Sequence, residues 1–306
     1  MPRHLISAAD VDRPLLDRLF ALAMVMEGAV ERAGAIDDLQ GRILATLFYE
    51  PSTRTRLSFE AAMLRLGGGV ISAENARDYS SGAKGETLED TVRIVAGYAD
   101  CIVVRHYEEG AAARMAAVSP VPVINGGDGP GEHPTQALLD LYTIQHELGS
   151  IDGLRIALVG DLANGRTVHS LCRLLPLYHG LSLSLIAPPA TRMRPDVLSF
   201  LRAHDIAYEE SEDLAAVAGK IDVLYQTRVQ KERFATVDEY ERASGRYTVD
   251  RVLMDHLRPN AIVLHPLPRV GEIDPAVDGD LRSAYFRQAR NGLFVRMALL
   301  KTLLAS

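Results

Sequence analysis

The sequence predicts an α/β protein made of two doubly wound parallel-sheet domains. The chain has 306 residues, more than one hydrophobic core usually organises, so two domains are expected. Short apolar runs that suit buried strands alternate with amphipathic helical segments along the chain. Several of these runs end directly in basic or hydrogen-bonding residues, and α/β proteins bind their ligands at the carboxyl ends of parallel strands.

Composition and charge exclude several classes of function. Hydrophobic residues make up 47% of the chain and charged residues 24%, which is typical of a globular protein. The net charge of −7 argues against binding to nucleic acid or to an anionic membrane, so any arginine cluster must act locally. No apolar run approaches the length of a membrane span, and the N-terminal residues lack a signal-peptide pattern. We therefore expect a cytoplasmic protein. Cys101 and Cys172 lie far apart in apolar surroundings and predict buried thiols.

The first domain is expected to begin with a helix, followed by a strand and a second helix. Asp12 is the predicted N-cap of the first helix, whose apolar face includes Leu15 and Leu19. Residues 43–50 are mostly apolar and predict a buried strand. Apolar residues recur at helical spacing in residues 57–66, so the second helix is expected there.

The turn between this strand and helix predicts an anion site. It reads Ser52-Thr53-Arg54-Thr55-Arg56. The first turn of a helix has unpaired backbone N–H groups and partial positive charge, so acidic residues usually occupy it. Arginines and hydroxyl groups make sense there if an anion such as a phosphate completes the site. The alternative is an ordinary N-cap with solvated arginines, because short motifs give false matches.

The next segment predicts a short strand at residues 70–72 and a helix at 87–97, joined by a polar loop at 75–86. This loop contains two glycines and one lysine, Lys84, and almost no apolar anchor. Such a run is by default a mobile surface loop. The competing interpretation is a lid that carries Lys84 as a retractable cation.

Two further strands in this domain lead to candidate ligand-binding residues. Residues 101–104 form a buried strand that ends in Arg105, and residues 121–125 form another, followed by a glycine-rich loop. His133 comes next, with Pro134 at the first position of a helix, where its missing N–H costs nothing. The positive helix end favours a neutral imidazole, which can donate a hydrogen bond to a carbonyl oxygen. A purely structural capping histidine is the alternative.

The second domain repeats the strand–helix pattern and ends in an apolar helix at residues 293–304. A loop with Gly160 and Gly165 leads to Arg166, but it matches neither the G-x-G-x-x-G nor the P-loop pattern, so no nucleotide cofactor is expected. Arg228 and His265 follow two of the strands in the way that Arg105 follows its own. The strands are predicted at residues 154–161, 183–188, 221–226 and 261–264.

The collected candidates are cations and neutral donors. They include no paired carboxylates, no nucleophile–histidine pair and no metal cluster, which excludes most hydrolase mechanisms. The set favours binding of two anionic substrates that react through positioning and electrostatic stabilisation. The candidates are Arg54, Arg56, Lys84, Arg105, His133, Gln136, Arg166, Arg228, Gln230 and Arg269.

These motifs, taken together and in this order, resemble the carbamoyltransferase family. The resemblance covers essentially the whole chain and rests on residues 52–56, 84–87, 133–136, 228–233 and 265–269. The segment at 228–233, and Leu267 within Pro-Leu-Pro, are similar to the aspartate-specific members. Ornithine-specific relatives typically carry a cysteine where this chain has Pro266.

The resemblance implies transfer of the carbamoyl group of carbamoyl phosphate to the amino group of L-aspartate, an early step of pyrimidine biosynthesis, without a cofactor or metal. The implied catalytic residues are Arg54, Thr55, Lys84, Arg105 and His133. The implied carbamoyl phosphate ligands are Ser52, Thr53, Arg54, Thr55, Ser80, Arg105, His133, Gln136, Leu267 and Pro268. The implied aspartate ligands are Lys84, Arg166, Arg228, Gln230 and Leu267, and the Leu267–Pro268 bond is expected to be cis.

The resemblance also implies an organisation of domains and partners. A carbamoyl phosphate domain is expected at residues 1–133 plus 287–306 and an aspartate domain at 134–286, with linking helices near 134–148 and 287–304 and the active site between the domains. Ser80 and Lys84 would come from the neighbouring subunit of a homotrimer, and a regulatory chain or a dihydroorotase is a candidate partner. Two alternatives remain: a carbamoyltransferase for another amine such as ornithine, and a catalytically silent homologue that serves as an assembly partner.

Overall fold

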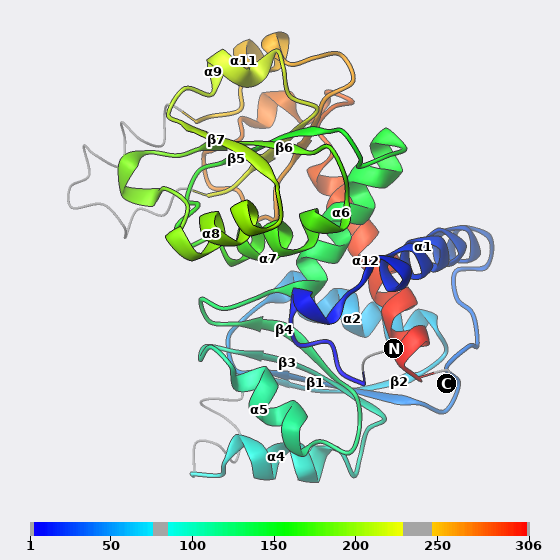
Figure 1. Cartoon of the computed structure of the whole chain (residues 1–306). Coiled ribbons are helices and arrows are strands. Elements are labelled where there is room, and N and C mark those ends of the chain that lie inside the picture. Colours follow the sequence, from blue (N-terminus) through cyan, green and yellow to red (C-terminus); the bar gives the residue numbers. More distant parts are fainter. Residues whose placement is uncertain (1–2, 76–84, 229–246, 305–306) are drawn as a thin grey trace. The chain divides into compact units, whose positions relative to one another are not determined.

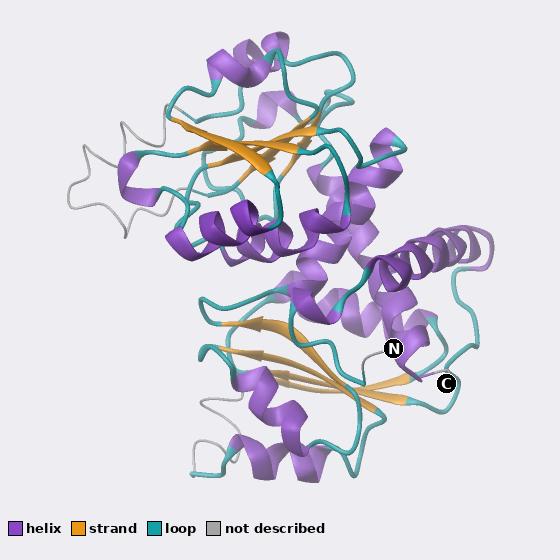
Figure 2. Ribbon diagram, in the orientation of Figure 1, coloured by secondary structure: helices purple, strands orange, loops and turns teal. Residues whose placement is uncertain are grey.

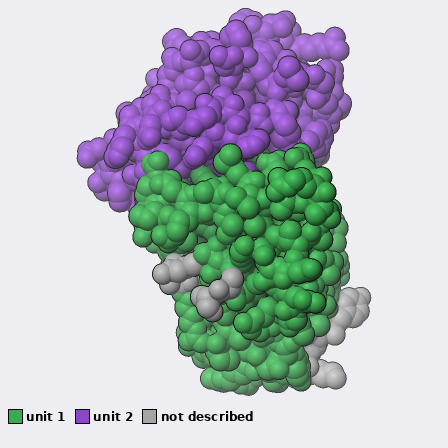
Figure 3. Space-filling model, turned by 90° about the vertical axis from the view of Figure 1, so that its right-hand side faces the viewer, with its two compact units in different colours: residues 1–139, 290–306 green, residues 140–289 purple. Residues whose placement is uncertain are grey.

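The computed structural model describes residues 3–75, 85–228 and 247–304 (Figure 1). The chain divides into two compact units, coloured separately in Figure 3. Unit 1 comprises residues 1–139 and 290–306, and unit 2 comprises residues 140–289. Each unit is built around a parallel sheet, which confirms the predicted fold class. The division into functional domains at 133/134 and 286/287 stays a prediction.

Unit 1 contains a four-stranded parallel sheet in the order β2-β1-β3-β4. Its helices lie on both faces, with α1 and α2 on one side and α4 and α5 on the other, as the labels of Figure 1 and the same view in Figure 2 show. The central strands are almost wholly buried, as expected for a parallel sheet that is covered twice. The strands are β1 (Ile43–Phe48), β2 (Gly69–Glu74), β3 (Cys101–His106) and β4 (Val123–Asp128). The helices are α1 (Arg13–Ala33), α2 (Thr53–Arg65), α4 (Leu88–Val95) and α5 (Ala111–Val118), with a short 3-10 helix at Ala8–Asp10.

Unit 2 contains a five-stranded parallel sheet in the order β7-β6-β5-β8-β9. Helices α7 and α8 cover one face, and α9 and α11 cover the other (Figure 1). The strands are β5 (Arg155–Val159), β6 (Ser182–Ile186), β7 (Ala207–Ser211), β8 (Val223–Gln226) and β9 (Ile262–Leu264). The helices are α7 (Arg166–Leu174), α8 (Pro195–Ala203), α9 (Ala215–Ala218) and α11 (Arg251–His256), with 3-10 turns at Leu175–Leu177, Pro189–Thr191 and Pro275–Val277.

Two long helices each contribute residues to both units. Helix α6 (Pro134–Leu148) begins in unit 1 and α12 (Tyr285–Leu304) ends in it. The last part of α12 is tied to the start of the chain, because Lys301 Nζ lies 2.7 Å from Asp38 Oδ2 and Arg290 Nη2 lies 2.8 Å from Glu31 Oε1. Unit 1 is therefore completed by residues from the far end of the sequence.

Strand order creates one switch point in each sheet. In unit 1 the chain moves from β1 outward to β2 and then returns to the other side at β3, and in unit 2 it does the same at β5 and β8. Loops diverge at the carboxyl ends of such strand pairs, and this is where open α/β sheets bind ligands. Functional residues are therefore expected at the carboxyl ends of the strand pairs β1/β3 and β5/β8.

Several local predictions can be compared directly with the structure. Asp12 caps α1 as predicted, with its Oδ1 accepting from the Leu15 N–H at 2.8 Å. Helix α2 begins at Thr53, earlier than the apolar pattern suggested, so the arginines at 54 and 56 are helical. Cys101 and Cys172 are buried free thiols, and burial raises the pKa of each to about 12. Within the described ranges, no helix is long and apolar enough to cross a bilayer.

Candidate active site

The turn after β1 presents an uncapped helix end. Ser52 occupies the N-cap position of α2 with an extended backbone, but its side chain makes no capping hydrogen bond. The first turn of the helix contains no acidic residue, and the side chains of Thr53 and Arg54 are exposed. Backbone N–H groups, hydroxyls and a guanidinium thus gather at the positive end of the helix. This arrangement suits a phosphate.

Arg56 has a different role from Arg54. Its Nη2 lies 2.7 Å from Glu74 Oε2, and its Nη1 lies 3.7 Å from Glu60 Oε1 and 3.3 Å from Ser72 Oγ. These contacts join α2 to the edge strand β2. Arg56 is therefore a structural residue, although the sequence motif grouped it with Arg54. The i,i+4 spacing to Glu60 was the signal that could have separated the two arginines.

Arg105 is the next-to-last residue of the neighbouring strand β3 and is held in place on two sides. Its side chain is buried, with Nη1 donating to the Gly126 carbonyl at 3.1 Å and Nη2 lying 3.2 Å from Glu50 Oε2. The parallel register sets Arg105 beside Phe48, the last residue of β1. Arg105 thus lies at the switch point that also carries Ser52. No local sequence pattern marks Glu50 as a partner of this arginine.

His133 meets the same site from the start of α6. It is buried, and its backbone carbonyl accepts from the Ala137 N–H, which places it at the N-terminus of the helix as predicted. Its Nε2 lies 3.4 Å from Thr55 Oγ1, and its Nδ1 lies 3.5 Å from Thr135 Oγ1. Gln136 is half-buried in the following turn. The helix starts of α2 and α6 are therefore in contact through Thr55 and His133.

The loop that carries His133 is fixed by Asp128. Its two carboxylate oxygens accept from the backbone N–H groups of Gly110 at 3.0 Å and Glu132 at 2.8 Å. Gly129 has a φ of 52°, and a Cβ there would lie 2.3 Å from the Tyr107 carbonyl oxygen. Only glycine fits at this close approach, so the glycine-rich sequence is needed to place the histidine.

In unit 2, the turn after β5 repeats the arrangement of an uncapped helix with an arginine. Arg166 is the first residue of α7, the N-cap Gly165 has no side chain to offer, and the first turn contains no acid. A Cβ on Gly165 would lie 2.7 Å from the Asp161 carbonyl oxygen. The buried Asp161 carboxylate accepts from the Asn164 N–H at 3.0 Å and shapes the loop. Arg166 thus begins a second helix whose N-terminus suits an anion.

Arg228 follows β8 at the carboxyl ends of the strands of this sheet, where Arg166 also lies. Just before it, the backbone N–H and the hydroxyl of Thr227 both donate to the Val159 carbonyl at 2.8 Å. Gly160 has a φ of 115°, and a Cβ there would lie 2.6 Å from the Thr227 carbonyl oxygen. The turns after β5 and β8 are therefore packed directly together. They place Arg166 and the exposed Arg228 at the switch point of unit 2.

The segment after β9 has an unusual backbone. The Leu267–Pro268 peptide bond is cis, as the resemblance implied, and Leu267 has a φ of 51°. The Leu267 N–H donates to Nδ1 of the buried His265 at 2.7 Å. Nε2 of the same ring lies 2.8 Å from Glu272 Oε1.

Arg269 is engaged by residues of unit 2. Its Nη2 donates to Asp278 Oδ2 at 2.7 Å, and its guanidinium lies 5.4 Å and 5.5 Å from the ring centroids of Tyr285 and Phe286. The Asp278 carboxylate raises the pKa of Arg269 above its ordinary value. These contacts make Arg269 a structural residue of unit 2.

The environment of Glu272 keeps its carboxylate ionised far into acid. Burial alone would raise its pKa, but hydrogen bonds from His265 and from backbone N–H groups outweigh burial and lower the pKa to about 2. The free carboxyl titrates near 4.5. The carboxylate therefore stabilises the fold above pH 4.5, and this contribution is lost as the pH falls from 4.5 toward 2.

We expect the variant Glu272→Gln to reveal this contribution. At pH 7 the variant should lose roughly 3 kcal/mol of unfolding free energy, since one pKa unit corresponds to about 1.4 kcal/mol. The difference between wild type and variant should shrink as the pH is lowered through the range from 4.5 to 2. Urea unfolding at a series of pH values measures it. A difference that is independent of pH would contradict the assignment.

Three predicted residues, Ser80, Lys84 and Gln230, lie outside the described residues. The predicted active site between the domains also stays a prediction. Among the residues that are described, no group of three His, Cys, Asp or Glu side chains is arranged to hold a metal ion.

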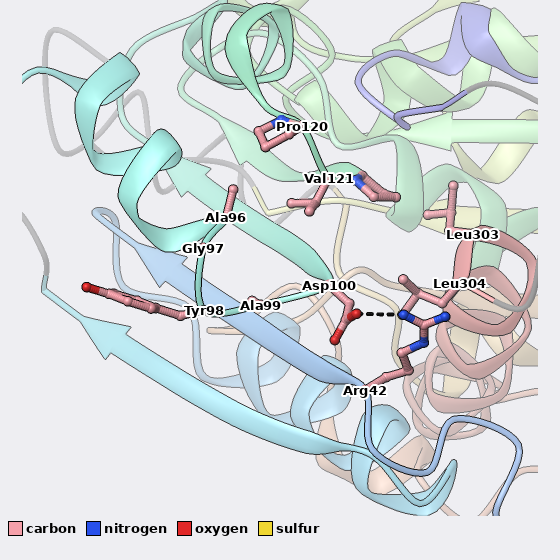
Figure 4. A pocket seen from close by; sticks show the side chains of 11 residues that line it. Arg42, Ala96, Gly97, Tyr98, Ala99, Asp100, Pro120, Val121, Leu303 and Leu304 are labelled. Atoms are coloured by element: carbon pink, nitrogen blue, oxygen red, sulfur yellow. Dashed lines mark hydrogen bonds and ion pairs between the residues drawn. The ribbon is translucent and has the colours of Figure 1, made fainter.

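A pocket of about 500 Å³ lies at the opposite edge of the unit 1 sheet (Figure 4). Arg42, Asp100 and Pro122 line it, and they immediately precede β1, β3 and β4. Arg42 Nη1 lies 2.7 Å from Asp100 Oδ1, so two of the lining residues form an ion pair. The pocket is therefore at the amino ends of the strands, away from the turns that carry the candidate residues.

Comparison with known proteins identifies similar sequences and structures. The carbamoyl-P binding domain of the aspartate/ornithine carbamoyltransferases matches residues 3–146, and their Asp/Orn binding domain matches residues 152–303. The chain is 56% identical to the chloroplastic aspartate carbamoyltransferase of Oryza sativa subsp. japonica, covering 98% of this chain and 84% of the relative. It is 50% identical to the aspartate carbamoyltransferase catalytic subunit of Methanococcus vannielii, covering 98% of both chains.

Solved structures give the same result. The catalytic subunit of M. jannaschii aspartate transcarbamoylase superposes with a TM-score of 0.95 at 48% identity, covering 99% of this chain and 98% of that one. The Trypanosoma cruzi aspartate transcarbamoylase in complex with carbamoyl phosphate superposes with a TM-score of 0.93 at 43% identity, covering 99% and 96%.

The same comparison corrects the expected cytoplasmic location. The relatives from rice and from Arabidopsis thaliana, both 56% identical, are chloroplastic enzymes. The expectation was therefore wrong. Composition and net charge describe the folded chain and do not specify a compartment.

Proposed function

Because the chain belongs to the aspartate/ornithine carbamoyltransferase family, we propose that it transfers the carbamoyl group of carbamoyl phosphate to the amino group of L-aspartate. The products are N-carbamoyl-L-aspartate and phosphate, and the reaction serves an early step of pyrimidine biosynthesis. Relatives of this activity are 50–56% identical over nearly the whole chain. The structural observation that carries the proposal is the uncapped, arginine-bearing helix end at the switch point of each sheet.

Unit 1 provides the proposed site for carbamoyl phosphate. Ser52, Thr53 and Arg54 hold the phosphate at the start of α2, which the missing side-chain cap and the absence of first-turn acids support. Arg105 approaches from β3, with its position set by Gly126 and Glu50. The carbamoyl nitrogen is held by Gln136 and by the backbone carbonyls of Leu267 and Pro268, and Ser80 from a neighbouring subunit completes the set.

Unit 2 provides the proposed site for aspartate. Arg166 binds the α-carboxylate, and Arg228 with Gln230 binds the side-chain carboxylate. A guanidinium can bind a carboxylate through two parallel hydrogen bonds, so two arginines at one sheet edge match a dicarboxylate. Lys84 from the neighbouring subunit and Leu267 complete the aspartate site.

The reaction then proceeds by positioning and charge stabilisation. The neutral amine of aspartate attacks the carbamoyl carbon, a C–N bond forms, and negative charge grows on the carbonyl oxygen. Thr55, Arg105 and His133 donate to that oxygen, and removing one such donor typically costs about 2.7–4 kcal/mol of transition-state stabilisation. The C–O bond to phosphate breaks, the phosphate leaves with the bonding electrons, and it accepts the proton that the amine loses. Arg54 and Arg105 stabilise the charge on the leaving phosphate.

A homotrimer is part of the proposal. Leu57 and Leu64, one face of α2, are 50% and 57% exposed, and Ile71 on the edge strand β2 is 40% exposed. Exposed apolar side chains along an unpaired sheet edge favour contact with another copy of the chain. A regulatory chain or a dihydroorotase is a candidate additional partner. The M. vannielii relative, for comparison, is a catalytic subunit.

Turnover of carbamoyl phosphate with L-aspartate and with L-ornithine, measured side by side, tests the proposed function. We expect carbamoylated product and phosphate with aspartate alone, because a cationic amine would meet Arg228 at this edge of the sheet. Product with ornithine alone would show that the segment from Arg228 to Gln230 has been misinterpreted. Activity with neither amine would favour a catalytically silent assembly partner.

A further inference from the structure

The backbone of Leu267 adopts a conformation that must be enforced by its surroundings. Its φ of 51° lies in the left-handed region, which is unfavourable for a bulky residue and persists only where contacts fix it. Pro266 and Pro268 flank it and have no N–H. The N–H of Leu267 is therefore the one amide donor in this tripeptide through which the backbone can be held.

His265 holds that donor. The Leu267 N–H donates to Nδ1 of His265 at 2.7 Å, so Nδ1 carries a lone pair and no proton. Nε2 must then carry the proton of the neutral ring, and it lies 2.8 Å from Glu272 Oε1. The ring is 2% exposed, so water does not compete for either nitrogen.

Glu272 fixes which ring nitrogen carries the proton. Its second oxygen, Oε2, accepts from the backbone N–H groups of Val270 and Gly271, both at 3.0 Å. All of these neighbours donate, so the carboxylate acts only as an acceptor, and its pKa of about 2 supports this. An acceptor at Nε2 selects the tautomer that leaves Nδ1 open for Leu267.

The backbone of His265 is fixed as well. Its N–H donates to Gln288 Oε1 at 2.8 Å, and Gln288 Nε2 donates to Asp140 Oδ1 at 2.6 Å. The Tyr225 hydroxyl donates to the other oxygen of this fully buried carboxylate at 2.7 Å. Residues of α6, α12 and β8 thus fix the backbone position of His265.

We propose that His265, oriented by Glu272, is a positioning residue that holds Leu267 so that its backbone carbonyl meets the carbamoyl nitrogen of the substrate. The inference rests on the proposed role of the Leu267 carbonyl. It adds two side chains that act on the reaction through Leu267 and touch no substrate themselves.

Two replacements of His265 separate this role from simple packing. In His265→Asn, the amide oxygen lies near the position of Nδ1 and still accepts from Leu267, but the contact with Glu272 is lost. In His265→Gln, the amide nitrogen reaches the position of Nε2 and still donates to Glu272, but Leu267 loses its acceptor. The two variants thus each keep a different half of the interaction.

We expect His265→Gln to lower kcat/KM for carbamoyl phosphate by about 10- to 100-fold, since small displacements of positioning groups have effects of that size. His265→Asn should retain more activity than His265→Gln. Thermal unfolding should rank them the other way, because Gln keeps the buried contact with Glu272. Opposite rankings for activity and stability are the signature of positioning. If His265→Asn is at least as impaired as His265→Gln in kcat/KM, the proposal is overturned.

A second pair of variants covers the case in which neither His265 variant folds. In Glu272→Gln, the amide N–H₂ group faces another donor, either the His265 ring N–H or the two backbone N–H groups. One of these hydrogen bonds is therefore lost, and kcat/KM should also fall. Asp222→Asn is the matched control, because Asp222 Oδ2 accepts from the Arg155 N–H at 2.9 Å at the other end of β5 and should affect stability alone. Wild-type kcat/KM in Glu272→Gln would overturn the proposal. An inactive wild type would instead overturn the proposed function.

Discussion

Replacement of Arg54 by alanine is expected to lower kcat by about 10²–10³-fold while the protein stays folded. Arg54 is exposed in the first turn of α2, where Ser52 makes no capping bond and no acid balances the positive helix end. Without Arg54, the positive charge that stabilises the leaving phosphate in the transition state is lost. The packing of the core changes little, because the side chain is exposed. Steady-state kinetics with circular dichroism measures both effects. Loss of the folded state would show that Arg54 is structural.

Arg56→Ala is the matched control two residues away. Arg56 lies in the same helical turn, but its guanidinium is committed to Glu74, Glu60 and Ser72. Its loss should lower the unfolding free energy and change kcat much less than the loss of Arg54 does. Equal losses of kcat in the two variants would mean that the turn acts as a general positive patch, with no specific role for Arg54.

Replacement of Arg228 by alanine is expected to raise the KM for L-aspartate by about 10²-fold, with a much smaller change in the KM for carbamoyl phosphate. A hydrogen bond to a charged group contributes about 1.5–3 kcal/mol, and a guanidinium can make two to a carboxylate. Arg228 lies with Arg166 at the switch point of unit 2, whereas the proposed phosphate ligands Ser52 to Arg54 lie in unit 1. Initial rates with each substrate varied in turn measure the difference.

Arg192→Ala is the control for that experiment. Arg192 is another exposed arginine of unit 2, and it lies 3.1 Å from Glu212 in a surface ion pair, which typically contributes little. Both KM values should stay close to wild type. If Arg228→Ala raised the two KM values equally, the division of the substrates between Arg228 and the unit 1 residues would be wrong.

Local sequence patterns predicted most of the fold because buried parallel strands are continuous apolar runs. The strands that precede Ser52, Arg105 and Arg228 were found in this way, and so were the residues that follow them. Strand β7 was missed. It is an edge strand with the sequence Ala-Tyr-Glu-Glu-Ser, mostly exposed, so it has neither an apolar run nor clear alternation.

Local sequence predicted which residues belong to the candidate site, but it did not predict most of the partners that hold them in place. Arg54 and Arg56 look alike in the motif. The spacing of Arg56 to Glu60 offers one local signal, but the contact with Glu74 on β2 forms only in the folded chain. The partnership of Arg105 with Glu50 depends on strand order, which the sequence does not encode locally. The pairing of His265 with Glu272 was missed for a similar reason, because it forms across an irregular segment that has no periodicity.

The division of the chain between the two units also bears on how the protein emerges during synthesis. Unit 2 is one uninterrupted stretch, residues 140–289, whereas unit 1 needs residues 290–306 from the end of the chain. The ion pairs of α12 with Asp38 and Glu31 therefore form only after both sheets have been translated. On the ribosome, the first unit to emerge is the last to be finished, and its α12-facing surface stays uncovered until residues 290–306 have been synthesised.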